Sequence, residues 1–147
     1  MQHLYYPYED FLTDAKRLTK KIDRKFDAII AIARGGLSLA QFLGEYYGLR
    51  AVYSINTIGY NDTKKLETVE IFNIPELNDV KKVLIVDDIV DSGDTLIEVL
   101  KILKKAYPNV TFKTASLFYK KSAKIAPDWY AKEAKEWIDF FWTEDLK

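Results

Sequence analysis

The sequence predicts an α/β fold in which a central parallel sheet is flanked by helices. Two short runs of mostly apolar residues, Phe26–Ala33 and Val83–Val86, are typical of strands that are buried on both faces. Segments with helical spacing alternate with the predicted strands, and this order favours parallel strands covered by helices. The chain has 147 residues, of which 48% are hydrophobic and 30% charged. We therefore expect one globular domain, residues 1–147.

The spacing of apolar residues also places the other elements. Further helices and strands are predicted at Tyr8–Ile22, Leu37–Tyr47, Ala51–Thr57, about Thr95–Tyr107 and Val110–Tyr119. Gly48 and Pro108 follow the second and third helices and are typical of helix ends. The polar segment Thr57–Leu66 predicts a loop or the turn of a hairpin, because alternation resumes at Thr68–Phe72.

Composition excludes or disfavours several classes of function. Because the chain has no cysteine, it has no disulfide, thiolate metal site or cysteine nucleophile. The single histidine, His3, lies near a terminus that we expect to be mobile, which argues against a Ser-His-Asp hydrolase. The 22 basic and 22 acidic residues balance, so no nucleic-acid partner is expected. We see neither a signal-peptide pattern nor an apolar run long enough for a membrane span, and we expect a cytoplasmic protein.

The segment Val83–Leu96 carries the clearest chemistry. Its apolar strand leads to Asp87 and Asp88, and the small and polar residues Asp91–Thr95 then precede a helix. The free N–H groups and the positive dipole end at the start of that helix suit a phosphate monoester. Two adjacent carboxylates would instead face ribose hydroxyls or Mg²⁺. The pattern indicates a ribose 5-phosphate site, although Asp, Ser and Thr are also common as ordinary helix caps.

The same segment, VLIVDDIVDSGDTL, closely resembles the motif that binds 5-phosphoribosyl 1-pyrophosphate in type I phosphoribosyltransferases. The resemblance implies a parallel sheet flanked by helices, with a small hood, formed here by the termini, over the active site. Asp87 and Asp88 would hold the ribose hydroxyls and metal-bound water, with Asp88 at the metal, and Asp91 would be the catalytic general base near purine N7. Ser92–Thr95 would hold the 5-phosphate. We expect the side chain of Asp94 to point away, since a carboxylate repels phosphate.

A second anion-binding loop is predicted at Ala31–Leu37, AIARGGL. A strand, an arginine and two glycines before a helix form a backbone nest, and Arg34 offers a fork for phosphate oxygens. By itself, a Gly-Gly turn before a helix is about as likely to be purely structural. Beside the first motif, the loop resembles the pyrophosphate loop of purine phosphoribosyltransferases, which implies a cis peptide at Ala33–Arg34. The implied contacts of the phosphoribosyl pyrophosphate are Ala33, Arg34, Gly35, Gly36, Asp87, Asp88, Asp91, Ser92, Gly93, Asp94 and Thr95.

The C-terminal region is expected to bind the acceptor base. Lys120 follows a predicted strand and can donate to the carbonyl of a 6-oxopurine, and Trp137 can stack on a flat ring. An isolated lysine is more often a solvated surface residue, and an isolated tryptophan is more often core. The region resembles bacterial xanthine-guanine and hypoxanthine phosphoribosyltransferases, which implies contacts from Lys120, Trp137 and the main chain of Ile138. The tail WIDFFW departs from their Trp-Ile-x-x-Pro-Trp pattern at Phe141.

The resemblance implies a purine salvage enzyme. Its substrates would be phosphoribosyl pyrophosphate and guanine, xanthine or hypoxanthine, its cofactor Mg²⁺, and its assembly a homo-oligomer, either dimer or tetramer. The polar segment Ser54–Lys65, including Ser54 and Tyr60, is expected to close over the site, or to be an ordinary surface hairpin. Two alternatives stay open: a regulator of the same fold that binds phosphoribosyl pyrophosphate, and an enzyme for a pyrimidine base such as orotate or uracil. The zero net charge argues against the first, and Lys120 with Trp137 against the second.

Overall fold

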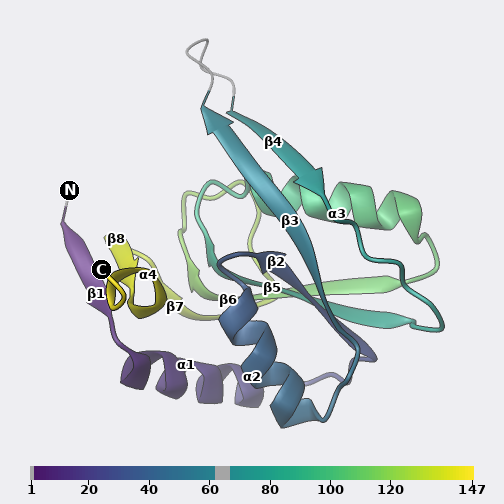
Figure 1. The fold of residues 1–147 in the computed structure, drawn as a ribbon, viewed down its shortest axis with the longest axis horizontal. Helices are drawn as coiled ribbons and strands as arrows, with labels where there is room; N and C mark the ends of the chain where they lie inside the picture. Colours follow the sequence, from purple (N-terminus) through teal and green to yellow (C-terminus); the bar gives the residue numbers. More distant parts are fainter. Residues whose placement is uncertain (1, 62–66) are drawn as a thin grey trace.

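The computed structural model describes residues 2–61 and 67–147, and within them the centre of the molecule is a six-stranded sheet (Figure 1). The strands lie in the order β4 (Glu67–Phe72), β3 (Val52–Asn61), β2 (Ala28–Ala33), β5 (Lys82–Val90), β6 (Thr111–Tyr119) and β7 (Trp129–Glu133). Neighbouring strands are parallel, except that β3 and β4 form an antiparallel hairpin. This mostly parallel sheet confirms the predicted fold class.

Helices cover both faces of the sheet. The first two, α1 (Tyr8–Lys21) and α2 (Leu37–Tyr47), pack on one face, and α3 (Asp94–Ala106) packs on the other. Alternate residues of β2 serve the two cores: Ile29 lies with α1 and α2, whereas Ile30 lies with α3. Every residue of β2 is therefore buried, which explains its wholly apolar sequence.

The two ends of the chain meet in a second, smaller sheet. In it β1 (His3–Tyr6) pairs in parallel with β8 (Trp137–Phe140), and the short helix α4 (Phe141–Glu144) follows β8. Figure 1 shows these elements gathered beside the main sheet, with both termini among them. This sheet is the hood that the family resemblance implied. Its β1 strand corrects the expectation of a mobile N-terminus, because Nδ1 of His3 lies 3.1 Å from Oδ2 of Asp139.

Aromatic packing joins the hood to the main core. Phe11 of α1 is fully buried and meets the ring of Trp142 edge-on at 5.6 Å and that of Phe141 at 5.8 Å. Phe140 stacks on Trp142 with ring centroids 4.6 Å apart. Much of the aromatic content of the chain thus fastens the hood to α1, and Phe141 has a packing role there.

Strand β5 is longer than predicted, and it contains the two acids that the sequence pattern placed after it. Its pairing with β6 continues through Asp87↔Ser116 to Val90↔Tyr119, whereas its pairing with β2 ends at Val86. The backbone stays hydrogen-bonded on one side only, so polar side chains can occupy the open end of the strand. The acids are therefore held by a sheet rather than by a loop.

The expected loop after residue 57 is a hairpin instead. β3 continues to Asn61 and pairs with β4, so the hairpin alternative is correct and the long loop is wrong. Residues 62–66 at its tip and the side chain of Tyr60 lie outside the described part, and closure of this segment over the site stays a prediction. Among the described residues, no helix combines the length and the apolar character that crossing a membrane requires.

Candidate functional site

Two cavities meet at the carboxyl ends of β5 and β6, where ligands bind in folds of this kind. The larger, of ≈650 Å³, lies between these strand ends and the hood. The smaller, of ≈220 Å³, lies where β5 leads into α3. Both are lined by Ile89 and Asp91, so a single ligand can extend from one into the other across Asp91.

The smaller cavity lies at the turn that begins α3. Ser92, Gly93 and Thr95 all line it, as the sequence predicted. Gly93 has φ 90°, a left-handed conformation that favours glycine, and a Cβ there would lie 3.1 Å from the backbone nitrogens of Lys124 and Ile125. The turn thus sets the cavity at the start of α3, where backbone N–H groups and the positive end of the helix dipole favour a phosphate; the N–H of Asp94 donates to Oγ of Ser92, at 3.2 Å.

Asp94 is the one residue of this turn whose side chain does not line the cavity. Its carboxylate lies 2.6 Å from Nζ of Lys124. The backbone N–H of Lys124 also donates to the carbonyl of Ser92, at 2.8 Å. The segment after β6 therefore holds the turn from outside and directs the carboxylate of Asp94 away from the anion site, as expected.

The acids Asp87 and Asp88 serve different cavities. Asp87 lines the smaller cavity and Asp88 the larger, and the two carboxyls are close enough to share a hydrogen bond. Burial raises the pKa of Asp87 well above its ordinary value, and the adjacent charge of Asp88 raises it further. Burial also raises the pKa of Asp88. Among the residues that the structure describes, no cationic side chain is a cause of either pKa shift, so the pair is suited to a cation or to hydroxyl donors.

A cation at this pair would take only part of its ligands from the protein. Within residues 2–61 and 67–147, no cluster of three or more His, Cys, Asp or Glu side chains is arranged to hold a metal ion. Mg²⁺ commonly binds through one or two carboxylates and completes its shell with water and phosphate oxygens. Asp87 and Asp88 fit that mode of binding.

The loop after β2 lies directly against these acids. Its peptide bond Ala33–Arg34 is cis, as the family resemblance implied. A Cβ at Gly35 would overlap the carboxylate of Asp88, and one at Gly36 would overlap the carbonyl oxygen of Val86. The loop thus lies directly against β5: Gly36 is required because its neighbours are backbone atoms, and a side chain at Gly35 would displace the Asp88 carboxylate. Arg34 is exposed and lines neither cavity, so the structure brings this backbone, but not the arginine side chain, to the site.

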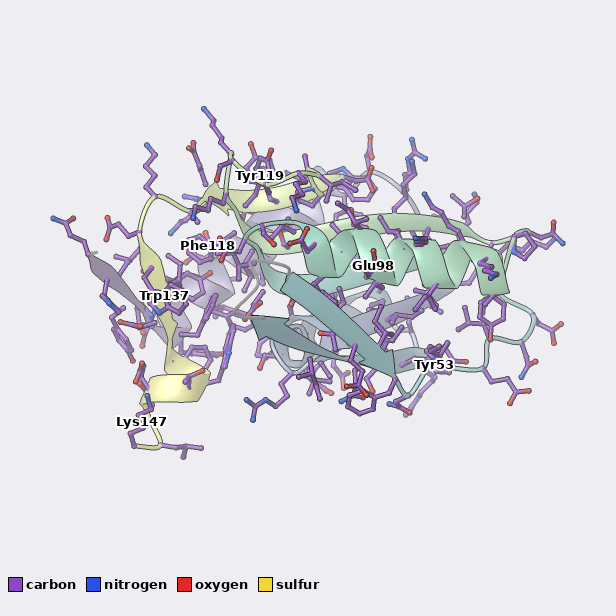
Figure 2. The ribbon with its side chains drawn as sticks, turned by 90° about the horizontal axis from the view of Figure 1, so that it is seen from above. Tyr53, Glu98, Phe118, Tyr119, Trp137 and Lys147 are labelled. Carbon is purple, nitrogen blue, oxygen red and sulfur yellow. The ribbon has the colours of Figure 1, made fainter. Side chains whose placement is uncertain are left out.

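The three residues predicted to bind the base come together in the larger cavity. Lys120, Trp137 and Ile138 all line it, although the first comes from the end of β6 and the others from β8. Figure 2 shows Trp137 on the hood and Tyr119 at the end of β6. Nζ of Lys120 lies 3.4 Å from Oδ1 of Asp91, which places a donor beside an acceptor at the joint of the two cavities. Trp137 is 53% exposed, which is unusual for a core residue and leaves its ring open to a ligand.

Several lining residues were not predicted. The hood and the segment before it add Ala134, Lys135, Glu136, Asp139, Phe140, Thr143, Glu144 and Lys147 to the larger cavity. They follow or precede Trp137 closely in sequence, and that proximity is the one signal that could have identified them. Ser54 lines neither cavity, and its hydroxyl lies 3.4 Å from Nδ2 of Asn73.

Comparison with known proteins gives a consistent result. The family described as "Phosphoribosyl transferase domain" matches residues 5–147. A xanthine-guanine-hypoxanthine phosphoribosyltransferase of Helicobacter pylori is 45% identical in sequence, with a TM-score of 0.92 over 99% of this chain and 96% of that one. A purine phosphoribosyltransferase of Pyrococcus horikoshii is 32% identical, with a TM-score of 0.85 over 98% and 95%. A xanthine-guanine phosphoribosyltransferase of Gluconobacter oxydans is 33% identical over 136 residues, which are 88% of this chain and 77% of that one.

The turn at Gly93 generates a prediction about phosphate binding. Gly93→Ala places a Cβ against the backbone of the Lys124 segment at a positive φ, so the turn must shift and we expect affinity for ribose 5-phosphate, measured by calorimetry, to fall at least about tenfold. Gly48→Ala is the matched control, because Gly48 also has a positive φ but no atom within 4 Å of its Cβ position. The control should lose stability and keep its affinity. Equal affinities in the two variants would refute the role of the turn.

The acid pair generates a prediction about stability and pH. A raised pKa in the folded state means that stability falls as pH rises through that pKa. Asp87→Asn should therefore be more stable than the unaltered protein at neutral pH, with a difference that vanishes below about pH 3, where the carboxyl is protonated in both the folded and the unfolded chain. The measurement is urea denaturation between about pH 3 and 8.

Asp27 offers a control of opposite sign for that measurement. Backbone N–H groups of Lys81 and Lys82, both at 2.9 Å, lower its pKa. Asp27→Asn should lose stability at neutral pH, with a difference that shrinks as pH falls through the pKa of the folded state. If both variants change the free energy of unfolding in the same direction at neutral pH, the electrostatic description of Asp87 and Asp88 is contradicted.

Proposed function

The chain belongs to the phosphoribosyl transferase family, and from that premise we propose that it transfers a 5-phosphoribosyl group from phosphoribosyl pyrophosphate to a 6-oxopurine, releasing pyrophosphate. The product would be a purine nucleoside monophosphate, so the enzyme would act in purine salvage. The proposal is supported most directly by the joining of an anion-binding turn and an aromatic-lined cavity at Asp91. The names of the relatives in Helicobacter pylori and Gluconobacter oxydans agree with it.

On the donor side, the smaller cavity would take the 5-phosphate. Ser92, Gly93 and Thr95 would bind its oxygens through backbone N–H groups and hydroxyls. The N–H of Asp94, which donates to Oγ of Ser92 at 3.2 Å, would join them when that hydroxyl turns to the phosphate. The ribose would then lie along β5, where Asp87 and Asp88 can accept hydrogen bonds from its hydroxyls. The cis loop from Ala33 to Gly36 would hold the pyrophosphate next to these acids, with the exposed guanidinium of Arg34 available to its oxygens.

On the acceptor side, Lys120 and Asp91 would recognise one edge of the purine. A 6-oxopurine presents the carbonyl oxygen O6 beside the ring atom N7. Lys120 would donate to O6, and the neighbouring carboxylate of Asp91 would accept from the N–H at N7. Trp137 would stack on the ring, and the main chain of Ile138 would contact its far edge. Adenine carries an amino group in place of O6, and Lys120 would then face a donor.

Asp91 would also act as the general base. The reaction breaks the bond between the anomeric carbon and the pyrophosphate oxygen, and it forms a bond from that carbon to a purine ring nitrogen. The purine loses a proton, and the carboxylate of Asp91 lies at the junction where that proton would be released. The protein's main contribution would be to position the two substrates and to stabilise the departing pyrophosphate.

Mg²⁺ is part of the proposal. Asp88, with Asp87 beside it, would hold the ion or its bound water, and the raised pKa values of the two carboxyls are consistent with a pair that a cation stabilises. When bound, the ion would neutralise charge on the pyrophosphate. We also propose a homo-oligomer and a cytoplasmic location, the latter because a charged donor such as phosphoribosyl pyrophosphate does not cross a bilayer unaided.

A substrate panel tests the proposal. Hypoxanthine, guanine, xanthine, adenine, uracil and orotate are each incubated with phosphoribosyl pyrophosphate and Mg²⁺, and pyrophosphate release is followed. We expect turnover with at least one 6-oxopurine, and at least about a hundredfold lower kcat/KM with adenine. No turnover with any of the first three bases would contradict the proposal. Turnover with uracil or orotate alone would show that the acceptor base is a pyrimidine.

The same assay tests Asp91. Asp91→Ala removes the proposed base and should lower kcat by about 10²- to 10⁴-fold. Asp23→Ala, at an exposed acid far from both cavities, is the matched control and should keep full activity. A normal rate in the Asp91 variant would show that another group removes the proton.

A further inference from the structure

The most deeply buried charged residue outside the two cavities lies between the hood and the main sheet. Asp14 of α1 has 0% exposure. Its carboxylate accepts the hydroxyl of Tyr6 at 2.7 Å and is paired with Nζ of Lys132 at 3.3 Å and Nη1 of Arg17 at 3.4 Å. It therefore joins α1, β7 and β1 at one point. A carboxylate buried in this way is strongly stabilised by its donors and costs much to leave unpaired.

Tyr6 connects Asp14 to β8, the strand that forms a wall of the larger cavity. Its side chain is 1% exposed, and its ring meets Phe118 of β6 at 4.9 Å and Phe140 of β8 at 5.7 Å, both edge-on. Its backbone is in register with Phe140 in the pairing of β1 with β8, and the same pairing places His3 opposite Trp137. The position of β1 consequently determines the position of the strand that carries Trp137 and Ile138.

The hood needs such an anchor because of its size. A sheet of two short strands is at best marginally stable by itself. Aromatic packing holds it against α1, and the hydrogen bond of 2.7 Å from Tyr6 to Asp14 adds a contact whose distance and direction are defined. Burial and the hydrogen bond to Asp14 both raise the pKa of Tyr6 far above its ordinary value, so this donor keeps its proton at all working pH values.

We propose that Tyr6 and Asp14 are positioning residues for the acceptor base: their hydrogen bond holds β8 at the spacing from Lys120 that lets one ring contact Lys120, Trp137 and Ile138 together. This inference rests on the proposed function, because it assigns the larger cavity to the base. Neither residue lines that cavity. Both act through β1 and β8, and the phosphate turn at the start of α3 does not depend on them.

Tyr6→Phe is the direct test, since it removes the hydroxyl and keeps the buried ring. We expect the KM for the preferred purine to rise about tenfold, with the KM for phosphoribosyl pyrophosphate and kcat unchanged within about twofold. Asp14→Asn keeps an oxygen acceptor for Tyr6, so its KM for the purine should lie between the values for Tyr6→Phe and the unaltered protein. A rise of both KM values together, or no rise in the KM for the purine, would overturn the proposal.

Tyr107→Phe is the matched control for lost stability. The hydroxyl of Tyr107 donates to the carbonyl of Pro75 at 2.8 Å and accepts from the N–H of Leu77 at 3.0 Å, on the opposite face of the main sheet. The control should lower Tm, as Tyr6→Phe does, and leave the KM for the purine unchanged. If the control raises that KM equally, Tyr6 has only a structural role.

Hydrogen–deuterium exchange tests the inference without turnover. In Tyr6→Phe we expect faster exchange of the Trp137–Phe140 amides and an unchanged rate in β5. Uniformly faster exchange along the chain would contradict a positioning role. A protein that turns over no purine, but shows the local change in exchange, would refute the proposed function while leaving the link from Tyr6 to β8 intact. An active protein without that local change would refute the link alone.

Discussion

The contact between the glycines after β2 and the acids of β5 is the constraint on which the site depends. Gly36 lies so close to the backbone carbonyl of Val86 that no other side chain fits there, and a side chain at Gly35 would displace the carboxylate of Asp88. This approach brings the loop after β2 against the neighbouring parallel strand β5. It places the backbone of that loop beside the Asp87 and Asp88 carboxyls, whose pKa values are raised by burial and whose charged forms would be stabilised by hydroxyl donors or a cation. The donor side of the site follows from this packing.

The acceptor side depends on a contact of a different kind. Its wall, β8, belongs to the hood rather than to the main sheet, and the hood is held by aromatic packing on Phe11 and by the buried carboxylate of Asp14. The proposed donor half is thus built on the main sheet, whereas the wall of the proposed base half that carries Trp137 belongs to the small sheet formed by β1 and β8. Such a division lets the specificity for the base change without disturbing the binding of the phosphoribosyl group.

The parts of the proposed donor half could be located from the sequence because they lie within two short segments. Ser92, Gly93 and Thr95 line one cavity, and the cis bond at Ala33–Arg34, which the family resemblance implied, is present. The family resemblance brought Lys120, Trp137 and Ile138 together correctly, which spacing alone could not do.

Features that depend on distant residues could not be predicted in this way. The pairing of His3 with Trp137 joins positions at opposite ends of the chain, so the order of the N-terminus was missed. The extension of β5 through Asp87 and Asp88 depends on β6, which lies more than a helix away in sequence. The hairpin that continues β3 to Asn61 has polar residues at positions where a loop is equally plausible from composition.

Because the two cavities meet at Asp91, a single ligand should occupy both, and calorimetry tests this directly. A purine nucleoside 5′-monophosphate carries the phosphate and the base in one molecule, whereas ribose 5-phosphate and the free base each fill one cavity. We expect the nucleotide to bind at least about a hundredfold more tightly than either fragment, because the second contact becomes intramolecular. Lys120→Ala and Gly93→Ala should each weaken its binding. A nucleotide that binds no more tightly than ribose 5-phosphate, with an affinity insensitive to Lys120→Ala, would show that the two cavities do not form one site.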